Sequence, residues 1–345
     1  MLFPRTLTLL CLIASTAAFS IGIGRPKVRK ILLTNDDGWA TAQMRAMMDA
    51  LIAEGYDVVM SGTSENQSGS SSKVATPTVL NVTCEFGTCD VGSPAMGANA
   101  SNPRINYVNS FPVNAAQYGL AVLTPKFFHS KPDFVVSGPN VGTNLLTDVP
   151  NSGTITILIL TMVTRLFSSF LGHDLYHSGA ACEAAKQGIP SAAFSGSNNS
   201  QIAYTTLLTD PTNLHSRAAL IDSKLTTTFL RTLFSSSSRP ILPPNITLNV
   251  NFAAIDQPGC SRAEDFKYVL TRVQPISGVN GTVGGRGDVR TCGSEVLPDE
   301  LAVVHSGGCF VSVSVIDAVR KVDVDAKTQE FVLGRIGRLL SCFRK

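Results

Sequence analysis

The sequence has few of the features that mark nucleic-acid-binding and zinc proteins. It contains one tryptophan, 7% aromatic residues and a net charge of only +3, so it offers neither a base-stacking platform nor a strongly basic surface. Its five histidines are scattered, and no cysteine–histidine cluster has the spacing of a zinc site. With 44% hydrophobic residues over 345 positions, the chain can still bury a sizeable core, as one large domain or two small ones.

The N-terminus lacks a long apolar run: the apolar segment there, Leu7 to Ala14, is short. Arg5 precedes this run and small residues at 15–18 follow it, which is the pattern of a secretory signal cleaved near Ala18 or Ser20. A membrane anchor would need a longer run, so we expect no stable membrane span. We therefore predict a signal peptide at residues 1–20 and a secreted glycoprotein. Six Asn-x-Ser/Thr sequons agree with export, at Asn66, Asn81, Asn99, Asn198, Asn245 and Asn280.

Removal of the signal would take Cys11 with it and leave an odd number of cysteines. In an oxidising compartment this predicts at least one free thiol or an intermolecular disulfide. Cys182 is the expected free thiol, because it lies in a run of good helix formers. Cys84 and Cys89 flank a Phe-Gly turn and could close a small loop. Pairing of the other four stays open, with Cys260–Cys292 as the first choice; the four are Cys260, Cys292, Cys309 and Cys342.

Two adjacent acids end a short apolar strand near the N-terminus of the mature chain. The run Ile31-Leu32-Leu33 leads through Thr34 and Asn35 into Asp36-Asp37-Gly38. Such a strand places the carboxylates at the carboxyl edge of a sheet, where open α/β sheets bind ligands. Two neighbouring carboxylates repel each other unless a cation lies between them, so the pattern favours a divalent metal site. A solvated Asp-Asp turn is the alternative for this segment alone.

Hydrophobic periodicity predicts an α/β fold with a doubly wound, mostly parallel sheet. Strands are expected at 29–34 and 56–60, with a helix over 42–54 between them that Gly55 ends. This is a βαβ unit, which implies parallel strands. Further strands are expected at 133–137 and within 187–195.

The remaining segments are predicted more coarsely. Residues 61–130, rich in Ser, Gly, Asn and Pro, are expected to cover the mouth of the site as loops. Residues 210–235 are predicted to be helical. Alternating apolar positions predict β structure at 248–252, 266–273 and 310–316.

Three further segments extend the acidic motif. Asn66–Ser70 follows the second strand, Pro132–Asn144 forms a strand and a Gly/Asn-rich loop, and Asn151–Thr154 comes next. In this order and spacing the four motifs resemble the SurE survival-protein family of metal-dependent phosphatases and nucleotidases, in its fungal-type secreted branch. The resemblance covers roughly residues 29–154 and 179–320. It implies a Rossmann-like fold of the SurE type, and a β-rich C-terminal extension that mediates dimerisation in the family, so a homodimer is possible.

The resemblance also implies a set of site residues. Asp36 and Asp37 would be catalytic and, together with Ser68 and Asn140, would ligate the metal. All four side chains offer oxygen, which suits Mg²⁺ or Mn²⁺ better than zinc. Asp36 is the favoured base for an attacking water, although the sequence cannot decide between the acids. The implied phosphate-binding residues are Asn35, Asn144, Ser152, Gly153 and Thr154.

The family pattern is interrupted after Thr154. The helix of small residues expected there begins only at Gly179, so residues 155–178 intervene. They could be a membrane segment, which Arg165 and the short apolar length disfavour, a lid, or a translated intron. The join at a motif boundary favours the intron. A second departure is Leu146, where the family has glycine.

The sequence therefore predicts a metal-dependent hydrolase of phosphoric monoesters, of the 5′-nucleotidase or acid phosphatase type, acting on nucleoside monophosphates or related small-molecule phosphate monoesters. The alternatives are a broad-specificity secreted acid phosphatase and a catalytically dead binding protein disrupted by the insert at 155–178. No nucleic-acid polymer is expected as a partner. The predicted domain organisation is a signal peptide at 1–20, a SurE-like domain at 29–320 (core 29–235, β-rich extension 245–320) and a C-terminal tail at 321–345.

Overall fold

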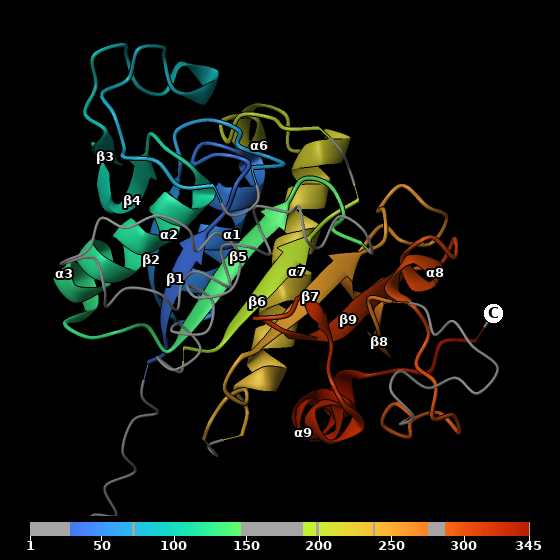
Figure 1. The fold of residues 1–345 in the computed structure, drawn as a ribbon. Coiled ribbons are helices and arrows are strands. Elements are labelled where there is room, and N and C mark those ends of the chain that lie inside the picture. Colours follow the sequence, from blue (N-terminus) through green and yellow to red (C-terminus); the bar gives the residue numbers. More distant parts are fainter. Residues whose placement is uncertain are drawn as a thin grey trace, which may run out of the picture.

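The computed structural model describes residues 28–70, 73–145, 189–197, 200–236, 239–274 and 287–344. Within these ranges the strands form one mixed sheet flanked by helices (Figure 1). The strands are β1 Lys30–Thr34, β2 Asp57–Thr63, β3 Met96–Asn99, β4 Asn102–Val108, β5 Phe134–Asn140, β6 Ser191–Ser195, β7 Ile246–Phe252, β8 Lys267–Thr271, β9 Phe310–Asp317 and β10 Val322–Asp323. The α-helices are α1 Ala42–Ala53, α2 Pro112–Tyr118, α3 Thr124–Phe128, α6 Thr206–Thr209, α7 Leu214–Leu233, α8 Glu300–Val304 and α9 Ala326–Ile336. Shorter helical turns are η1 Glu85–Gly87, η2 Gly119–Leu123, η4 Ala263–Asp265 and η5 Gly337–Leu339.

The sheet reverses its winding direction between β1 and β5. Its strand order is β10-β9-β7-β6-β5-β1-β2-β4-β3, with β8 paired to β9. Leu32 of β1 pairs in parallel with Val59 of β2 on one side and with Val135 of β5 on the other. From β1 the chain proceeds outward to β2 and β4, whereas from β5 it proceeds the other way, to β6 and β7. Ligands of open α/β sheets bind at the carboxyl ends of strands at such a reversal. The predicted doubly wound, mostly parallel sheet is confirmed.

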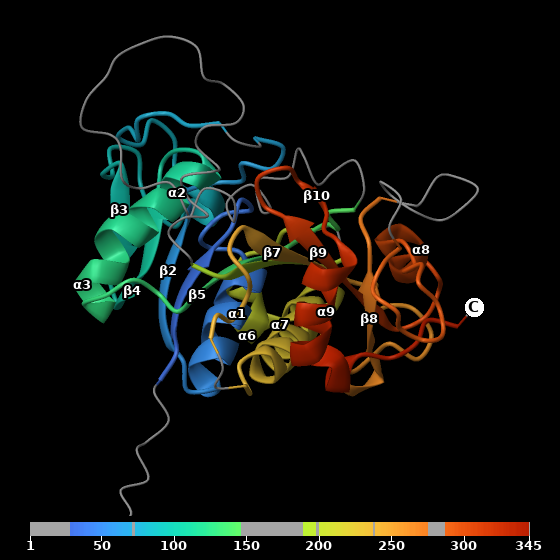
Figure 2. The ribbon, with the colours of Figure 1, turned by 60° about the horizontal axis from the view of Figure 1, so that its bottom comes forward.

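Helices cover both faces of the sheet (Figure 2). On one face α1 and α7 bury apolar side chains such as Met44, Met47 and Phe229 in the larger core cluster. On the other face Leu123 of η2 and Phe128 of α3 pack in a second cluster with Leu32. α1 begins where Thr41 caps it by accepting a hydrogen bond from the Met44 backbone N–H. The methionine stripe of the sequence is therefore core, as its helical spacing predicts.

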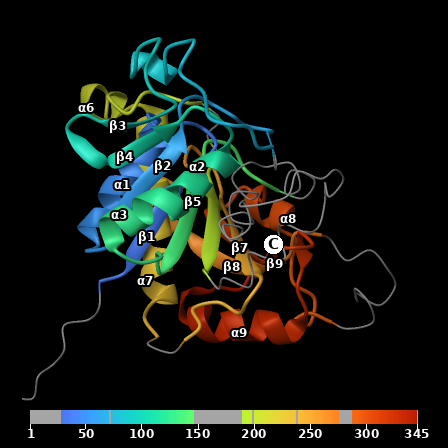
Figure 3. The same ribbon diagram turned by 60° about the vertical axis from the view of Figure 1, so that its left-hand side comes forward.

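The C-terminal extension continues the central sheet. β7 pairs antiparallel with β9, Asn249 opposite Ser314, and β8 joins β9 in parallel. The segment predicted as a tail contains α9, which lies beside the C-terminal strands (Figure 3) and buries Val332 and Ile336 in the larger core cluster.

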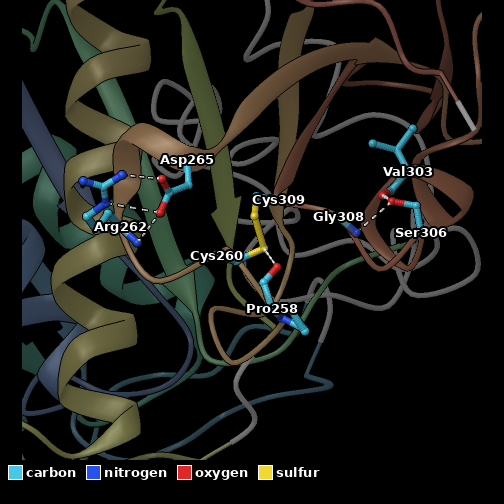
Figure 4. The surroundings of a disulfide bond; sticks show 8 residues. All are labelled: Pro258, Cys260, Arg262, Asp265, Val303, Ser306, Gly308 and Cys309. Atoms are coloured by element: carbon cyan, nitrogen blue, oxygen red, sulfur yellow. Dashed lines mark hydrogen bonds and ion pairs between the residues drawn. A yellow bond between two sulfur atoms is a disulfide. The ribbon is translucent and has the colours of Figure 1, made fainter.

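The disulfides confirm one expected pairing and correct another. Cys84 and Cys89 are bonded, as predicted. The pairing Cys260–Cys292 is wrong, because Cys260 bonds Cys309 (Figure 4) and Cys292 bonds Cys342. The sheet explains the correction: Phe252 at the end of β7 pairs with Val311 at the start of β9, so the chain after β7 lies beside the chain before β9. Cys182 lies outside the described residues.

Residues 61–130 carry more regular structure than the prediction of covering loops. This stretch contains the β3–β4 hairpin and the continuous helical run from α2 through η2 to α3. In the structure β4 is an interior strand and α2 packs on it. The prediction failed because the Ser-, Asn- and Pro-rich composition of residues 61–130 is typical of loops. Among the described residues, no helix is long and apolar enough to cross a membrane.

Candidate active site

The acidic pair lies in the turn between β1 and α1, at the carboxyl edge of the sheet. Asp36 and Asp37 are each only 2% exposed. Asn35 lies beneath the turn and donates from Nδ2 to the Gly38 carbonyl at 2.8 Å, so it supports the acidic turn. Gly38 has φ of +117°, a conformation that favours glycine. The backbone therefore holds two carboxylates close together in a buried position.

Three donors from separate segments converge on the Asp37 carboxylate. The Val141 backbone N–H donates to Oδ2 at 2.7 Å, and Gln201 Nε2 donates to Oδ1 at 2.9 Å. The Ser68 hydroxyl donates to Oδ1 at 3.3 Å. The structure thus brings together the first, second and third motifs of the sequence at one carboxylate.

Burial and mutual repulsion disfavour two negative charges at Asp36 and Asp37. Burial, and after it the neighbouring Asp36 charge, raise the pKa of the Asp37 carboxyl to about 7, against the lowering effect of the three donors. Both causes penalise a second negative charge in this position. A bound divalent cation would remove that penalty.

Asn140 ends β5 beside the acidic pair. Its Nδ2 donates to the Gly142 carbonyl at 2.5 Å, and its own carbonyl accepts from the Gly196 N–H at 2.9 Å. The next residue, Val141, is the one whose N–H holds Asp37. Asn140 thus lies at the same strand edge as the acidic turn, and its metal role stays a prediction.

The donor chemistry suits a hard cation. The predicted set is two carboxylates, a hydroxyl and an amide oxygen, the oxygen ligands that Mg²⁺ and Mn²⁺ accept. Among the described residues, no group of three or more His, Cys, Asp and Glu side chains is placed to hold a metal. Two carboxylates with neutral oxygens fit a magnesium-type site.

Asn144 lies in a buried polar network. Its Nδ2 donates to Ser195 Oγ at 2.8 Å, and its N–H donates to Asn251 Oδ1 at 2.8 Å. Its carbonyl accepts from Asn249 Nδ2 at 2.9 Å and from Asn251 Nδ2 at 3.2 Å. Asn249 also donates to Glu300 Oε2 at 3.0 Å. This arrangement fixes the backbone of the loop that follows β5. The other predicted phosphate ligands, Ser152, Gly153 and Thr154, lie outside the described residues.

Sequence reasoning missed four residues that support this edge: Gln201, Asn249, Asn251 and Glu300. Gln201 carried no signal, because it lies in a loop distant in sequence from every motif. Asn249 and Asn251 had one: they are amides on one face of a strand whose other face is apolar, and both are fully buried. Such polar residues inside a strand need partners, and the loop after β5 supplies them.

The chain is similar to known proteins in sequence. The family described as "Survival protein SurE" matches residues 31–166. An acid phosphatase of Yarrowia lipolytica is 30% identical, over 83% of this chain and 78% of the relative. A 5′-nucleotidase SurE of Lawsonia intracellularis is 32% identical over 48% of this chain and 50% of its own length. The chain therefore spans about half of this bacterial relative and most of the yeast one.

The fold also has a match among solved structures. The crystal structure of the SurE protein from Aquifex aeolicus aligns with a TM-score of 0.51 over 88% of this chain and 98% of that one. At 19% identity this likeness concerns the fold alone.

Proposed function

The chain belongs to the SurE family, and from this premise we propose that it hydrolyses phosphate monoesters with a divalent metal held at Asp36 and Asp37. Nucleoside monophosphates and related small phosphates are the proposed substrates, and Mg²⁺ or Mn²⁺ is the proposed ion. The observation that carries this proposal is the convergence of Ser68, Val141 and Gln201 on the buried Asp37 carboxylate at the sheet's reversal point.

The residues take distinct roles. Asp36, Asp37, Ser68 and Asn140 would hold the ion, which when bound supplies positive charge against the phosphoryl oxygens and the attacking water. The Val141 N–H and Gln201 fix the orientation of the Asp37 carboxylate, because their hydrogen bonds restrict the rotation of its side chain. The Asp36 carboxylate would accept the proton of the water. Asn35 supports the acidic turn from below.

The test compares p-nitrophenyl phosphate with AMP as substrates, using the full-length chain with and without EDTA. We expect hydrolysis of both, loss of hydrolysis in EDTA, and recovery on adding Mg²⁺ or Mn²⁺. Activity that persists in EDTA would contradict the metal assignment. Metal binding without hydrolysis of either substrate would instead support a binding protein.

A broad-specificity acid phosphatase is the second candidate. It is favoured by the yeast acid phosphatase, whose similarity extends over far more of this chain than that of the Lawsonia nucleotidase. A kcat/KM for p-nitrophenyl phosphate equal to that for AMP would favour this candidate. A clear preference for AMP, lost with phosphate esters that lack a base, would favour the nucleotidase.

Export of the chain is a separate proposal. It is supported by three disulfides among the described residues, because disulfides persist in oxidising compartments. Asn66 and Asn81 are exposed sequon asparagines, so both are open to glycosylation. Mass analysis of protein from the medium of an expressing fungal host tests the cleavage near Ala18 and the glycans together. A homodimer stays a prediction, which light scattering on the same material tests.

A further inference from the structure

A small loop closed by Cys84–Cys89 lies against the acidic turn. This disulfide loop, residues 84–89, contacts the β1–α1 turn, residues 35–41, through two side chains. The Ala40 backbone N–H donates to Glu85 Oε1 at 2.8 Å, and the Trp39 indole N–H donates to Thr88 Oγ1 at 3.1 Å. The disulfide joins the two ends of the loop, whose Cα atoms are 5.0 Å apart.

The loop is also fixed to the body of the protein. The Glu85 N–H donates to the Ser64 carbonyl at 3.0 Å, just after β2, and Cys84 N–H donates to the Cys89 carbonyl at 2.9 Å. Glu85 is therefore held from both sides, by β2 through its backbone and by the acidic turn through its carboxyl. Neither contact was predictable from the four family motifs, which do not include residues 84–89.

Gly38 shows how closely the two segments approach. A Cβ built on Gly38 would lie 2.1 Å from Glu85 Oε2, closer than any real contact. The Glu85 carboxyl thus occupies the space that a side chain at position 38 would take, directly beside Asp37. A residue in this position restricts the turn from outside, while Asn35 restricts it from below through the Gly38 carbonyl.

We propose that Glu85, presented by the Cys84–Cys89 loop, is a positioning residue that holds the Asp36–Asp37 turn in its metal-binding conformation. The proposal rests on the proposed metal function of the two aspartates. Glu85 touches neither aspartate through a hydrogen bond; it acts through the backbone of Ala40 and the packing against Gly38. Residues outside the ligand set that orient ligands commonly set metal affinity.

Glu85 contacts the acidic turn through the oxygen that accepts the Ala40 N–H, and this contact does not require a negative charge. Burial raises the pKa of the Glu85 carboxyl to about 8, against the lowering effect of the Ala40 hydrogen bond. A protonated carboxyl still accepts the Ala40 N–H, and a glutamine amide oxygen at the same place would do so as well. The conservative variant is therefore expected to preserve function, and the truncated one to lose it.

The experiment compares Glu85→Ala, Glu85→Gln and the double variant C84S/C89S with wild type. The matched control is C292S/C342S, which removes a disulfide far from the acidic turn, between the loop before α8 and the C-terminal residues. Binding of Mn²⁺ is measured by titration calorimetry on the full-length protein without substrate. Trp39, the single tryptophan of the chain and only 3% exposed, reports on the turn through its fluorescence.

We expect Glu85→Ala and C84S/C89S to weaken Mn²⁺ binding by about tenfold or more and to shift Trp39 emission to the red, as solvent reaches the indole. Glu85→Gln should bind Mn²⁺ within about threefold of wild type, because the acceptor is kept. The control should lower thermal stability without changing affinity or emission. Wild-type affinity in Glu85→Ala, or equal losses in C292S/C342S, would overturn the proposal. Failure of wild type itself to bind Mn²⁺ would instead refute the proposed function.

Discussion

Asn249 and Glu300, both in the C-terminal extension, are joined by a hydrogen bond of 3.0 Å. Asn249 lies on β7 and also donates to the Asn144 carbonyl, while Glu300 begins α8 and also accepts from Ser314 Oγ on β9 at 2.9 Å. Glu300 and Asn249 are fully buried. The extension therefore supports the loop after β5 directly.

The first prediction concerns Glu300. We expect Glu300→Ala to lower the free energy of unfolding by about 1–3 kcal/mol, because it removes an acceptor that the buried Asn249 amide and Ser314 hydroxyl share. The loop carrying Asn144 should loosen with them, so KM for phosphate esters should rise more than kcat falls. Thermal unfolding and steady-state kinetics measure the two effects. Glu295→Ala, at an exposed position shortly before α8, is the matched control; equal effects in the two variants would contradict the supporting role.

The second prediction concerns the acidic pair. Asp36→Asn and Asp37→Asn should each lower kcat/KM by about a hundredfold or more while the fold stays intact, since each removes a charge that the cation needs. Kinetics at saturating Mg²⁺ or Mn²⁺ test the loss, and circular dichroism tests the fold. Asp90→Asn, at an exposed position, is the control. Near-normal turnover in either variant would refute the metal assignment.

The third prediction concerns metal and stability. In the metal-free protein the buried Asp36 and Asp37 carboxylates repel each other, so a cation that binds only the folded state should raise the melting temperature. We expect Mn²⁺ to raise the melting temperature of wild type, in proportion to the logarithm of its concentration, and to have little effect on Asp37→Asn. Scanning calorimetry across a Mn²⁺ series measures this. An equal rise in both proteins would indicate a cation site elsewhere.

The sequence predicted the centre of the fold well and its periphery poorly. The β1–α1–β2 unit was recognisable because strand and helix periodicity agreed with the Gly55 stop, and the structure has these elements within a residue or a few of the predicted bounds. β4 was missed because its sequence, Asn102 to Val108, opens with Asn-Pro and alternates over only four residues.

The residues of the candidate site also fall into those that could be named from the sequence and those that could not. Asp36 and Asp37 could be named because they follow a predicted strand, whose carboxyl end is where open α/β sheets bind ligands. Ser68 and Asn140 were named because the resemblance to the SurE family implied them. Gln201 and Glu85 could not be named, because they reach Asp37 and the Gly38 turn from loops whose course depends on tertiary packing. Disulfide pairing failed for the same reason: Cys260 and Cys309 meet only because β7 and β9 are neighbours.

The fourth prediction concerns residues 155–178, which lie outside the described residues. The family match ends at residue 166, inside this segment. An apolar insert in the sequence is an aggregation liability if it is exposed, so we expect its deletion to raise both the soluble yield and the specific activity. Sequencing the mature transcript shows whether the segment is an intron. If the message encodes it and the full-length enzyme is more active than the deletion variant, the segment is a lid.

The last prediction concerns Asp222 on α7, which is 4% exposed and lies against the backbone of Gly196 at the end of β6. Burial raises the pKa of its carboxyl from 3.8 to about 8. Between these values the folded protein holds a proton that the unfolded chain has released, so the free energy of unfolding falls as pH rises through this window. The stabilising contribution is complete below about pH 4 and is lost as the pH passes 8.

Asp222→Asn removes this titration and keeps the shape of the side chain. We expect the melting temperature of Asp222→Asn, relative to wild type, to increase from pH 5 upward and to level off above about pH 8, because only the wild type must keep a buried acid protonated against rising pH. Asp256→Asn, at an exposed position, should run parallel to wild type over the same range. A pH-independent difference between Asp222→Asn and wild type would show that the Asp222 carboxyl has its ordinary pKa in the folded protein.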